Sequence, residues 1–134
     1  MVSTDRAFSG FSVHDIATAQ TFYRDVLGLT VNLNAMGFLN LHFDNGGVVL
    51  IYNKPDHVPA TFTVLNFDVD DIDAAVDDLA AHGIHMTKYE GMHQDEKGIA
   101  RGLSVNQGPD IAWFTDPAGN ILSVLQTMPS ADRP

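Results

Sequence analysis

The chain of 134 residues contains no cysteine, and none of its apolar runs approaches the roughly 20 residues that span a bilayer. The lack of cysteine excludes disulfides, thiol nucleophiles and thiolate zinc sites. The N-terminal stretch MVSTDRAFSG lacks a basic start followed by an apolar core, so we expect no secretory signal. Together these absences predict a cytoplasmic protein without a membrane segment.

Basic residues are also scarce, because 7 Lys and Arg oppose 17 Asp and Glu, which gives a net charge of −10. An acidic surface repels phosphate backbones and anionic lipids, so we expect neither nucleic acid nor a membrane as a partner. The same charge would attract a cationic small molecule, or it would serve only to keep the protein soluble.

What the sequence does contain is an internal repeat. FSVHDIATAQTFYRDVLGLTV (residues 11–31) and FDVDDIDAAVDDLAAHGIHM (residues 67–86) share their apolar spacing. In each copy an aspartate precedes a helical pattern of apolar residues, and we expect Asp15 and Asp71 to be the N-caps. Each helix is predicted to end at a glycine in the left-handed conformation, Gly28 or Gly83.

Strand-like segments follow each predicted helix. The first helix precedes residues 29–34, 38–43 and 47–53, and the second precedes residues 84–89, 110–115 and 120–126. Turn-forming residues at 44–46 and 116–119 predict tight hairpins within the two sets. We therefore predict one α+β domain over residues 1–134, made of two β-α-β-β-β modules at about 7–53 and 61–126.

The two halves, the helix end FYRDVLG and the hairpin DPAGN resemble the vicinal oxygen chelate superfamily over roughly residues 7–126. This superfamily includes glyoxalase I, bleomycin-resistance and extradiol-dioxygenase-like proteins. The resemblance implies a curved mixed sheet around a cup, with the helices outside. It also implies a homodimer, since many members complete their cups between subunits.

In the metalloenzyme members, the resemblance implies one His or Glu projecting into the cup from the first and last strand of each half. Motif alignment places Phe8, Val49, Val64 and Ser123 at these positions. A shift of one residue does not supply a ligand, because no His, Asp, Glu or Cys occurs in residues 7–13, 47–53, 61–67 or 120–126. We therefore expect no metal and no cofactor.

The predicted cup is largely apolar with a few polar points, which suits a small organic ligand. The alternative is that the same side chains pack against one another as core. The predicted ligand-binding residues are Phe8, Ser12, Asn40, His42, Val49, Ile51, Val64, Asn66, Trp113 and Ser123.

His42 is the weak candidate for catalysis, because it shares a predicted strand face with Asn40 and imidazole titrates near pH 6.5. A hydrogen-bonded structural histidine is the plainer interpretation, and a core position is the plainer one for Trp113. We interpret His14 and His57 as surface residues.

The stretch HMTKYEGMHQDE (residues 85–96) is the richest in groups that could bind a metal, but its spacing fits no usual ligand pair. We interpret it as a solvated loop. The connection 91–109 is long for a compact domain, so its Met92, His93 and Arg101 are predicted to form a rim that selects the ligand.

The sequence leaves three functions open, and whether the protein is an enzyme is among the undecided points. The first is a metal-independent binding protein of the glyoxalase/bleomycin-resistance type, which sequesters a cationic or aromatic ligand. The second is a metal-free isomerase or lyase that uses His42 for proton transfer. The third, placed last, is a divalent-metal lyase or dioxygenase with ligands from residues 85–96.

Overall fold

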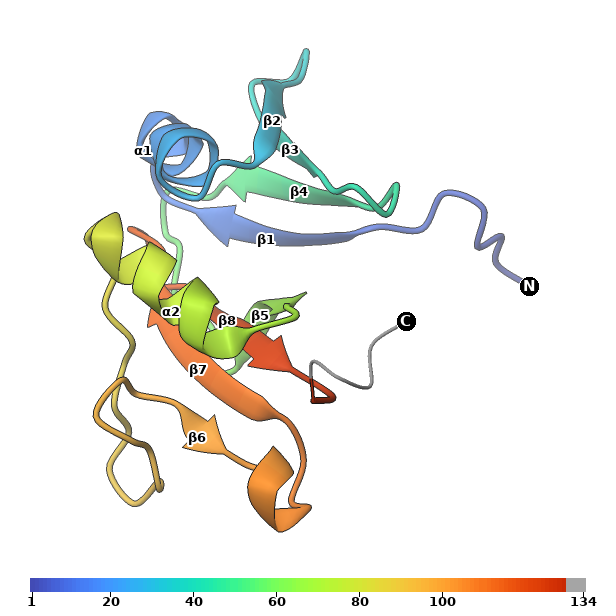
Figure 1. The fold of residues 1–134 in the computed structure, drawn as a ribbon. Coiled ribbons are helices and arrows are strands. Elements are labelled where there is room, and N and C mark those ends of the chain that lie inside the picture. Colours follow the sequence, from blue (N-terminus) through green and yellow to red (C-terminus); the bar gives the residue numbers. More distant parts are fainter. Residues whose placement is uncertain (130–134) are drawn as a thin grey trace. The chain divides into compact units, whose positions relative to one another are not determined.

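The computed structural model describes residues 1–129 and divides the chain into two compact units, which are treated separately (Figure 1). The first unit comprises Met1–Pro59 and the turn Asp116–Gly119. The second comprises the rest of the described chain, from Ala60 to Thr115 and from Asn120 onward. Within residues 1–129, no helix is both long enough and apolar enough to cross a membrane.

The first unit has the predicted β-α-β-β-β order. Its elements are β1 (Ser9–Val13), α1 (Ile16–Thr21) continued by a π-helical turn (Phe22–Val26), β2 (Thr30–Leu33), β3 (Leu39–His42) and β4 (Val48–Asn53). The sheet order is β1-β4-β3-β2, with β1 and β4 parallel and the other pairs antiparallel. The predicted N-cap is confirmed, because the Asp15 carboxylate accepts a hydrogen bond from the Thr18 N–H.

One face of this sheet is buried, and its residues were not all predicted correctly. Val49 and Ile51 were expected on the open face, but Ile51 lies beside Phe11 in the parallel β1–β4 ladder, and both Val49 and Ile51 are buried. Paired residues of neighbouring strands share a face, so this register sends Val49 and Ile51 into the core. Leu50 and Tyr52 occupy the open face in their place.

The second unit repeats the order with a shorter second strand. Its elements are β5 (Thr63–Asp68), α2 (Ile72–Ala81), β6 (Ala100–Arg101), a 3₁₀ turn (Leu103–Val105), β7 (Asp110–Thr115) and β8 (Ile121–Gln126). The sheet order is β5-β8-β7-β6, again with the first pair parallel. The Asp71 carboxylate caps α2 at the Ala74 N–H, and Gly83 ends the helix with φ of +81°. The α+β class and the two β-α-β-β-β modules are thus confirmed, each module with its own sheet.

The strand predicted at residues 84–89 is wrong, since the second strand of this module is β6, at Ala100–Arg101. A side chain takes the place of a strand partner here: Gln94 Oε1 accepts from the Tyr89 N–H, and its Nε2 donates to the Thr87 carbonyl. The Thr87 N–H alone donates toward β7, at the Trp113 carbonyl. Because Gln94 satisfies these backbone groups, the segment needs no sheet partner.

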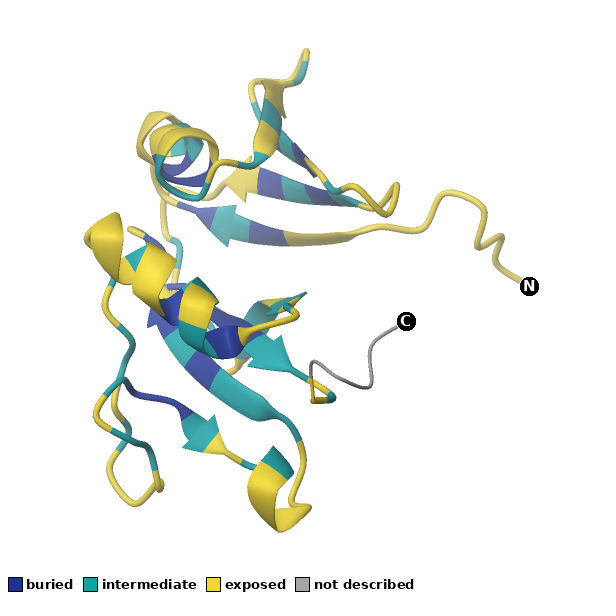
Figure 2. Cartoon of the chain, in the orientation of Figure 1, coloured by how far each residue is buried: buried dark blue, intermediate teal, exposed yellow. Residues whose placement is uncertain are grey.

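The core of the second unit lies between α2 and one face of its sheet. Ile72 and Val76 of α2 are buried, as are Ala112 and Phe114 of β7. Burial alternates along β7, where the intervening Trp113 is only partly covered (Figure 2). Trp113 therefore points to the face opposite the helix, which is where the candidate site lies.

Candidate functional site

Trp113 is the centre of the candidate site, on the open face of the second unit's sheet. In the strand register it lies beside Ser123 of β8, which in turn lies beside Asn66 of β5. The indole Nε1–H donates a hydrogen bond of 3.2 Å to Thr63 Oγ1, and Thr63 belongs to β5. The indole therefore reaches from β7 across β8 to the edge strand.

A hollow of about 190 Å³ lies against this indole. Tyr89 meets Trp113 edge-on, with ring centroids 5.6 Å apart and planes at 84°. Phe62 is 68% exposed although it is a large apolar side chain, and Met92 is 45% exposed. We call this hollow the aromatic groove; it is lined by Thr61, Phe62, Thr63, Tyr89, Met92, Trp113 and Ile121.

The loop that carries Tyr89 and Met92 is held by specific hydrogen bonds. Gln94 binds backbone groups on both sides of the loop, including the Gly98 carbonyl at 2.7 Å. The Asp95 carboxylate accepts from the Lys97 and Ile99 N–H groups, and Ile99 is completely buried. These bonds place the aromatic wall formed by Tyr89 against Trp113.

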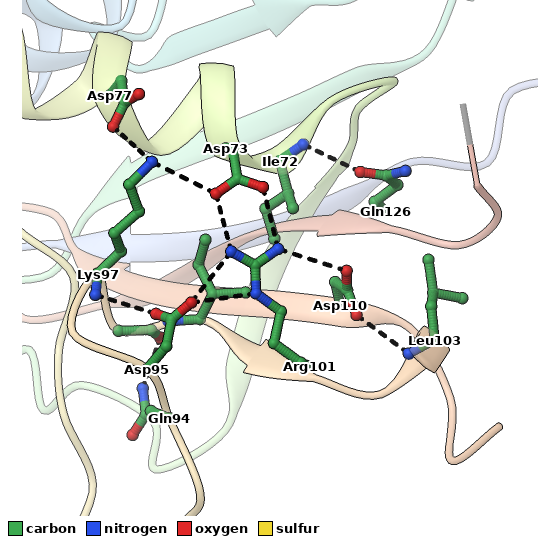
Figure 3. A network of polar contacts seen from close by, with 12 residues as sticks. Ile72, Asp73, Asp77, Gln94, Asp95, Lys97, Arg101, Leu103, Asp110 and Gln126 are labelled. Atoms are coloured by element: carbon green, nitrogen blue, oxygen red, sulfur yellow. Dashed lines mark hydrogen bonds and ion pairs between the residues drawn. The ribbon is translucent and has the colours of Figure 1, made fainter. Parts of the chain in front are cut away.

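A network of ion pairs joins the same loop to α2 (Figure 3). Arg101 contacts Asp73 at 2.8 Å, Asp95 at 3.0 Å and Asp110 at 3.7 Å. Its hydrogen bonds to Asp73 lower the pKa of that carboxyl to about 2, with Lys97 adding to the effect. Arg101 was predicted to form part of a ligand-selecting rim, but its guanidinium forms ion pairs with the three carboxylates named above. Of the three predicted rim residues, Met92 is the one that lines the groove.

A polar pair adjoins the groove on the open face. Ser123 Oγ donates a hydrogen bond of 2.5 Å to Asn66 Oδ1, and Ser123 is completely buried whereas Asn66 is exposed. The structure therefore brings together three of the predicted site residues, namely Asn66, Trp113 and Ser123. Val64 lies half-buried at the β-bulge between Thr63 and Leu65 of the same edge strand.

The first unit holds the other predicted residues. Asn40 and His42 share the open face of β3, as expected, and His42 is exposed and in contact with Asn32 through their side chains. Phe8 precedes β1 and is 64% exposed. Ser12 is half-buried on β1, where it contacts a residue that sequence reasoning had set aside.

That residue is His57, which was expected at the surface but is half-buried and hydrogen-bonded on both ring nitrogens. Nε2 lies 3.1 Å from the Ala118 carbonyl, which can only accept, so Nε2 carries the proton. Nδ1 is then the acceptor for the Ser12 hydroxyl at 2.6 Å. Thr63 and Tyr89 of the groove were also not predicted from the sequence. Both contact Trp113, which lies 50 residues after Thr63 and 24 residues after Tyr89, so short-range spacing gave no signal for them.

The residues of the chain do not fit a divalent metal at the positions that the family resemblance implies. Phe8 and Val64 carry no donor, and the Ser123 hydroxyl is bonded to Asn66. Val49 points into the core, and Leu50, which takes its place on the open face, carries no donor either. Divalent ions need imidazole or ionised oxygen ligands. Within residues 1–129 there is also no group of three or more His, Cys, Asp and Glu side chains placed to hold a metal ion.

Comparison with known proteins shows what this arrangement is similar to. The sequence model of the Glyoxalase/Bleomycin resistance protein/Dioxygenase superfamily matches residues 7–124. No curated protein matches the chain.

Solved structures share the fold at low sequence identity. TnmS3, an antibiotic binding protein from Streptomyces sp. CB03234, is 19% identical with a TM-score of 0.62, over 94% of this chain and 99% of that one. The oxidase ChaP-H2 is 23% identical with a TM-score of 0.64, over 98% and 96%. A glyoxalase/dioxygenase from Nostoc punctiforme is 16% identical with a TM-score of 0.63, over 95% and 96%.

Proposed function

This chain belongs to the Glyoxalase/Bleomycin resistance protein/Dioxygenase superfamily, and on that premise we propose that it binds and sequesters a small aromatic molecule without a metal. The observation that carries the proposal is the aromatic groove, where Phe62 and Met92 stay exposed beside the indole of Trp113. A flat apolar ligand would cover these side chains and remove their surface from water, which is the main source of affinity in such sites.

The shape of the groove favours a ring system over an aliphatic chain. Tyr89 stands edge-on to Trp113, and both rings line the groove together with Phe62. Offset stacking and edge-to-face contacts add about 0.5–1.5 kcal/mol per pair beyond the area buried. An antibiotic binding protein of the same fold supports a role in binding a small molecule. The net charge of −10 favours cationic and neutral ligands over anionic ones.

The test uses the fact that Trp113 is the sole tryptophan in the sequence. Its indole N–H therefore gives a single side-chain NMR signal, which reports on the groove alone. We expect one- and two-ring aromatic compounds to shift this signal on titration, with cationic and neutral probes binding more tightly than anionic ones. Phe62→Ala should weaken binding by at least about fivefold, since roughly 1 kcal/mol of apolar contact is lost.

Val105→Ala is the matched control, because Val105 is an exposed apolar residue of the same unit that does not line the groove. This variant should bind like the wild type. An indole signal that no aromatic probe shifts would contradict the proposal, as would equal losses in the two variants. Treatment with a chelator, or incubation with nickel, zinc, manganese or iron(II), should leave the affinity unchanged; about one retained metal per chain would contradict metal independence.

A metal-free enzyme is the second candidate, and the Ser12–His57 pair is the observation that favours it. Nδ1 of His57 accepts a hydrogen bond from the Ser12 hydroxyl, with 2.6 Å between Oγ and Nδ1, which is the geometry of a base beside a hydroxyl. His42, on the open face of the same sheet, is the other candidate for proton transfer in an isomerase or lyase. Turnover that is lost in His42→Ala or His57→Gln while ligand binding persists would favour the enzyme over the sequestering protein.

A further inference from the structure

The Asn66 side chain has a defined orientation. Ser123 is completely buried, so its hydroxyl needs a partner, and it donates to Asn66 Oδ1 at 2.5 Å. This bond turns the carbonyl end of the Asn66 amide toward β8 and leaves the amide NH₂ directed elsewhere. Among the described residues, the NH₂ group of Asn66 makes no hydrogen bond, and the residue is exposed.

This free donor lies next to the aromatic groove. Asn66 and Thr63 are on the same edge strand, and Thr63 accepts the hydrogen bond of the Trp113 indole. Asn66, Ser123 and Trp113 are also neighbours across three strands of the sheet. Because neighbouring strands lie about 4.8 Å apart, the Cα atoms of Asn66 and Trp113 are separated by about 10 Å. A two-ring molecule stacked on the indole spans much of that distance.

The size of the groove limits the occupant. Its volume of about 190 Å³ is below the roughly 300–1,000 Å³ of pockets for drug-sized ligands. A molecule of one or two rings fits this space, whereas a protein segment or a nucleic acid does not. The indole N–H is already taken by Thr63, so it cannot recognise a polar group of the ligand.

We infer that the ligand of the aromatic groove is a one- or two-ring compound bearing an acceptor oxygen, such as an aryl ketone, and that the Asn66 amide NH₂ donates to that oxygen. The inference rests on the proposed function and adds the chemical class of the ligand. Asn66 acts here as a specificity-determining residue. A ligand that carries an acceptor oxygen binds better to a site that offers it a donor than to a purely apolar site, where the oxygen would lose its hydrogen bonds to water.

The experiment compares 1-indanone with indane, two bicyclic compounds of similar size that differ in the ketone oxygen. Both are titrated into the full chain, and the indole N–H signal of Trp113 gives their dissociation constants. The ratio of the indane constant to the indanone constant is then compared between the wild type and Asn66→Ala. Because the same two compounds are used throughout, their different hydration cancels in this comparison.

We expect the ratio to fall by about fivefold in Asn66→Ala, the size of one neutral hydrogen bond. Asn66→Asp keeps an acceptor for Ser123 while removing the donor, so it should show the same loss even where Asn66→Ala folds poorly. Gln107→Ala is the matched control: it removes an exposed amide of the same unit whose side chain makes no hydrogen bond among the described residues, and its ratio should equal that of the wild type.

The outcomes separate the two proposals. If both compounds shift the indole signal but the ratio is the same in the wild type and both Asn66 variants, the acceptor inference is overturned and the groove stands as a site for apolar rings. If neither compound shifts the signal, the proposed function fails and the inference fails with it. A ratio that falls equally in Gln107→Ala would also overturn the role of Asn66.

Discussion

The hydroxyl of Tyr23 donates a hydrogen bond of 2.7 Å to the carboxylate of Asp116, which lies 93 positions further along the chain. Both residues are buried, and burial together with the neighbouring carboxylate raises the pKa of Tyr23 well above its usual value. The phenol therefore remains protonated and remains a donor. The other oxygen of Asp116 accepts from the Ala118 N–H, so one side chain shapes the turn Asp116–Gly119 and ties it to the first unit.

Removing the Tyr23 hydroxyl should destabilise the protein with little change in packing. In Tyr23→Phe the Asp116 carboxylate loses a buried donor, and we expect the free energy of unfolding to fall by about 1–3 kcal/mol. Urea unfolding followed by circular dichroism measures the change. Tyr52→Phe, at a partly exposed tyrosine without a side-chain hydrogen bond among the described residues, is the control and should stay within about 0.5 kcal/mol of the wild type.

Two glycines with the same backbone conformation should respond differently to alanine. Gly98 and Gly46 have φ of +85° and +87°, but a Cβ on Gly98 would lie 2.7 Å from Met86 Cβ, whereas one on Gly46 would meet nothing within 4 Å. Both substitutions incur the strain of a positive φ, about 1 kcal/mol. Gly98→Ala should cost at least about 1 kcal/mol more, because the loop must also shift around Met86. Equal unfolding midpoints for the two variants would contradict this account.

The Arg101 network predicts a pH dependence of stability. The pKa of Asp73 is lowered from its ordinary value near 3.8 to about 2, so its contribution is complete above pH 4 and is lost as the pH falls through about 2. The Asp73 side chain is 46% exposed, so solvent screens the pair and we expect about 1 kcal/mol rather than the full shift. Asp73→Asn should lower the free energy of unfolding at pH 7. The further decrease in this free energy between pH 4 and 2 should be smaller in the variant than in the wild type.

Asp78→Asn serves as the control for the acid measurement. Asp78 lies on the same helix, but it contacts neither Lys97 nor Arg101. Its stability profile should follow that of the wild type between pH 4 and 2. If Asp73→Asn also follows the wild type, the network does not stabilise the loop in solution.

His57 should contribute to stability more than an exposed histidine does. His57→Ala removes the hydrogen bonds to Ser12 and to the Ala118 carbonyl, and we expect a loss of about 1–2 kcal/mol. His93→Ala, at an exposed position of the loop, should change stability by less than about 0.5 kcal/mol. Thermal unfolding of the two variants measures the difference. Similar melting temperatures would show that the two hydrogen bonds of His57 add nothing to stability and that it behaves like an exposed histidine.

Interactions between residues close in sequence were the predictable part of the fold. Asp15 and Asp71 were identified as N-caps because each carboxylate acts on an N–H three residues later. The hairpin turn before β4 was predicted from neighbouring residues as well, and Gly46 in that turn has a positive φ. The repeat of these local signals in both halves is what predicted two β-α-β-β-β modules.

Predictions failed where a distant residue decides the outcome. The segment 84–89 has the apolar alternation of a strand, but the Gln94 side chain occupies its backbone groups. β4 is apolar along most of its length, so its sequence does not show which face points to the core. That face is set by pairing with β1, where Ile51 lies beside Phe11, 40 positions earlier in the chain.

The sequence by itself determined the α+β class, the modular order and the lack of metal ligands at the four expected positions, because these depend on residue type and short-range spacing. Only the tertiary structure decided that Trp113, Tyr89 and Phe62 share one groove, and that His57 joins Ser12 to Ala118. The physical reason is that a side chain's partners across a sheet or between loops follow from chain folding over tens of residues, whereas caps and turns are made by neighbours along the chain.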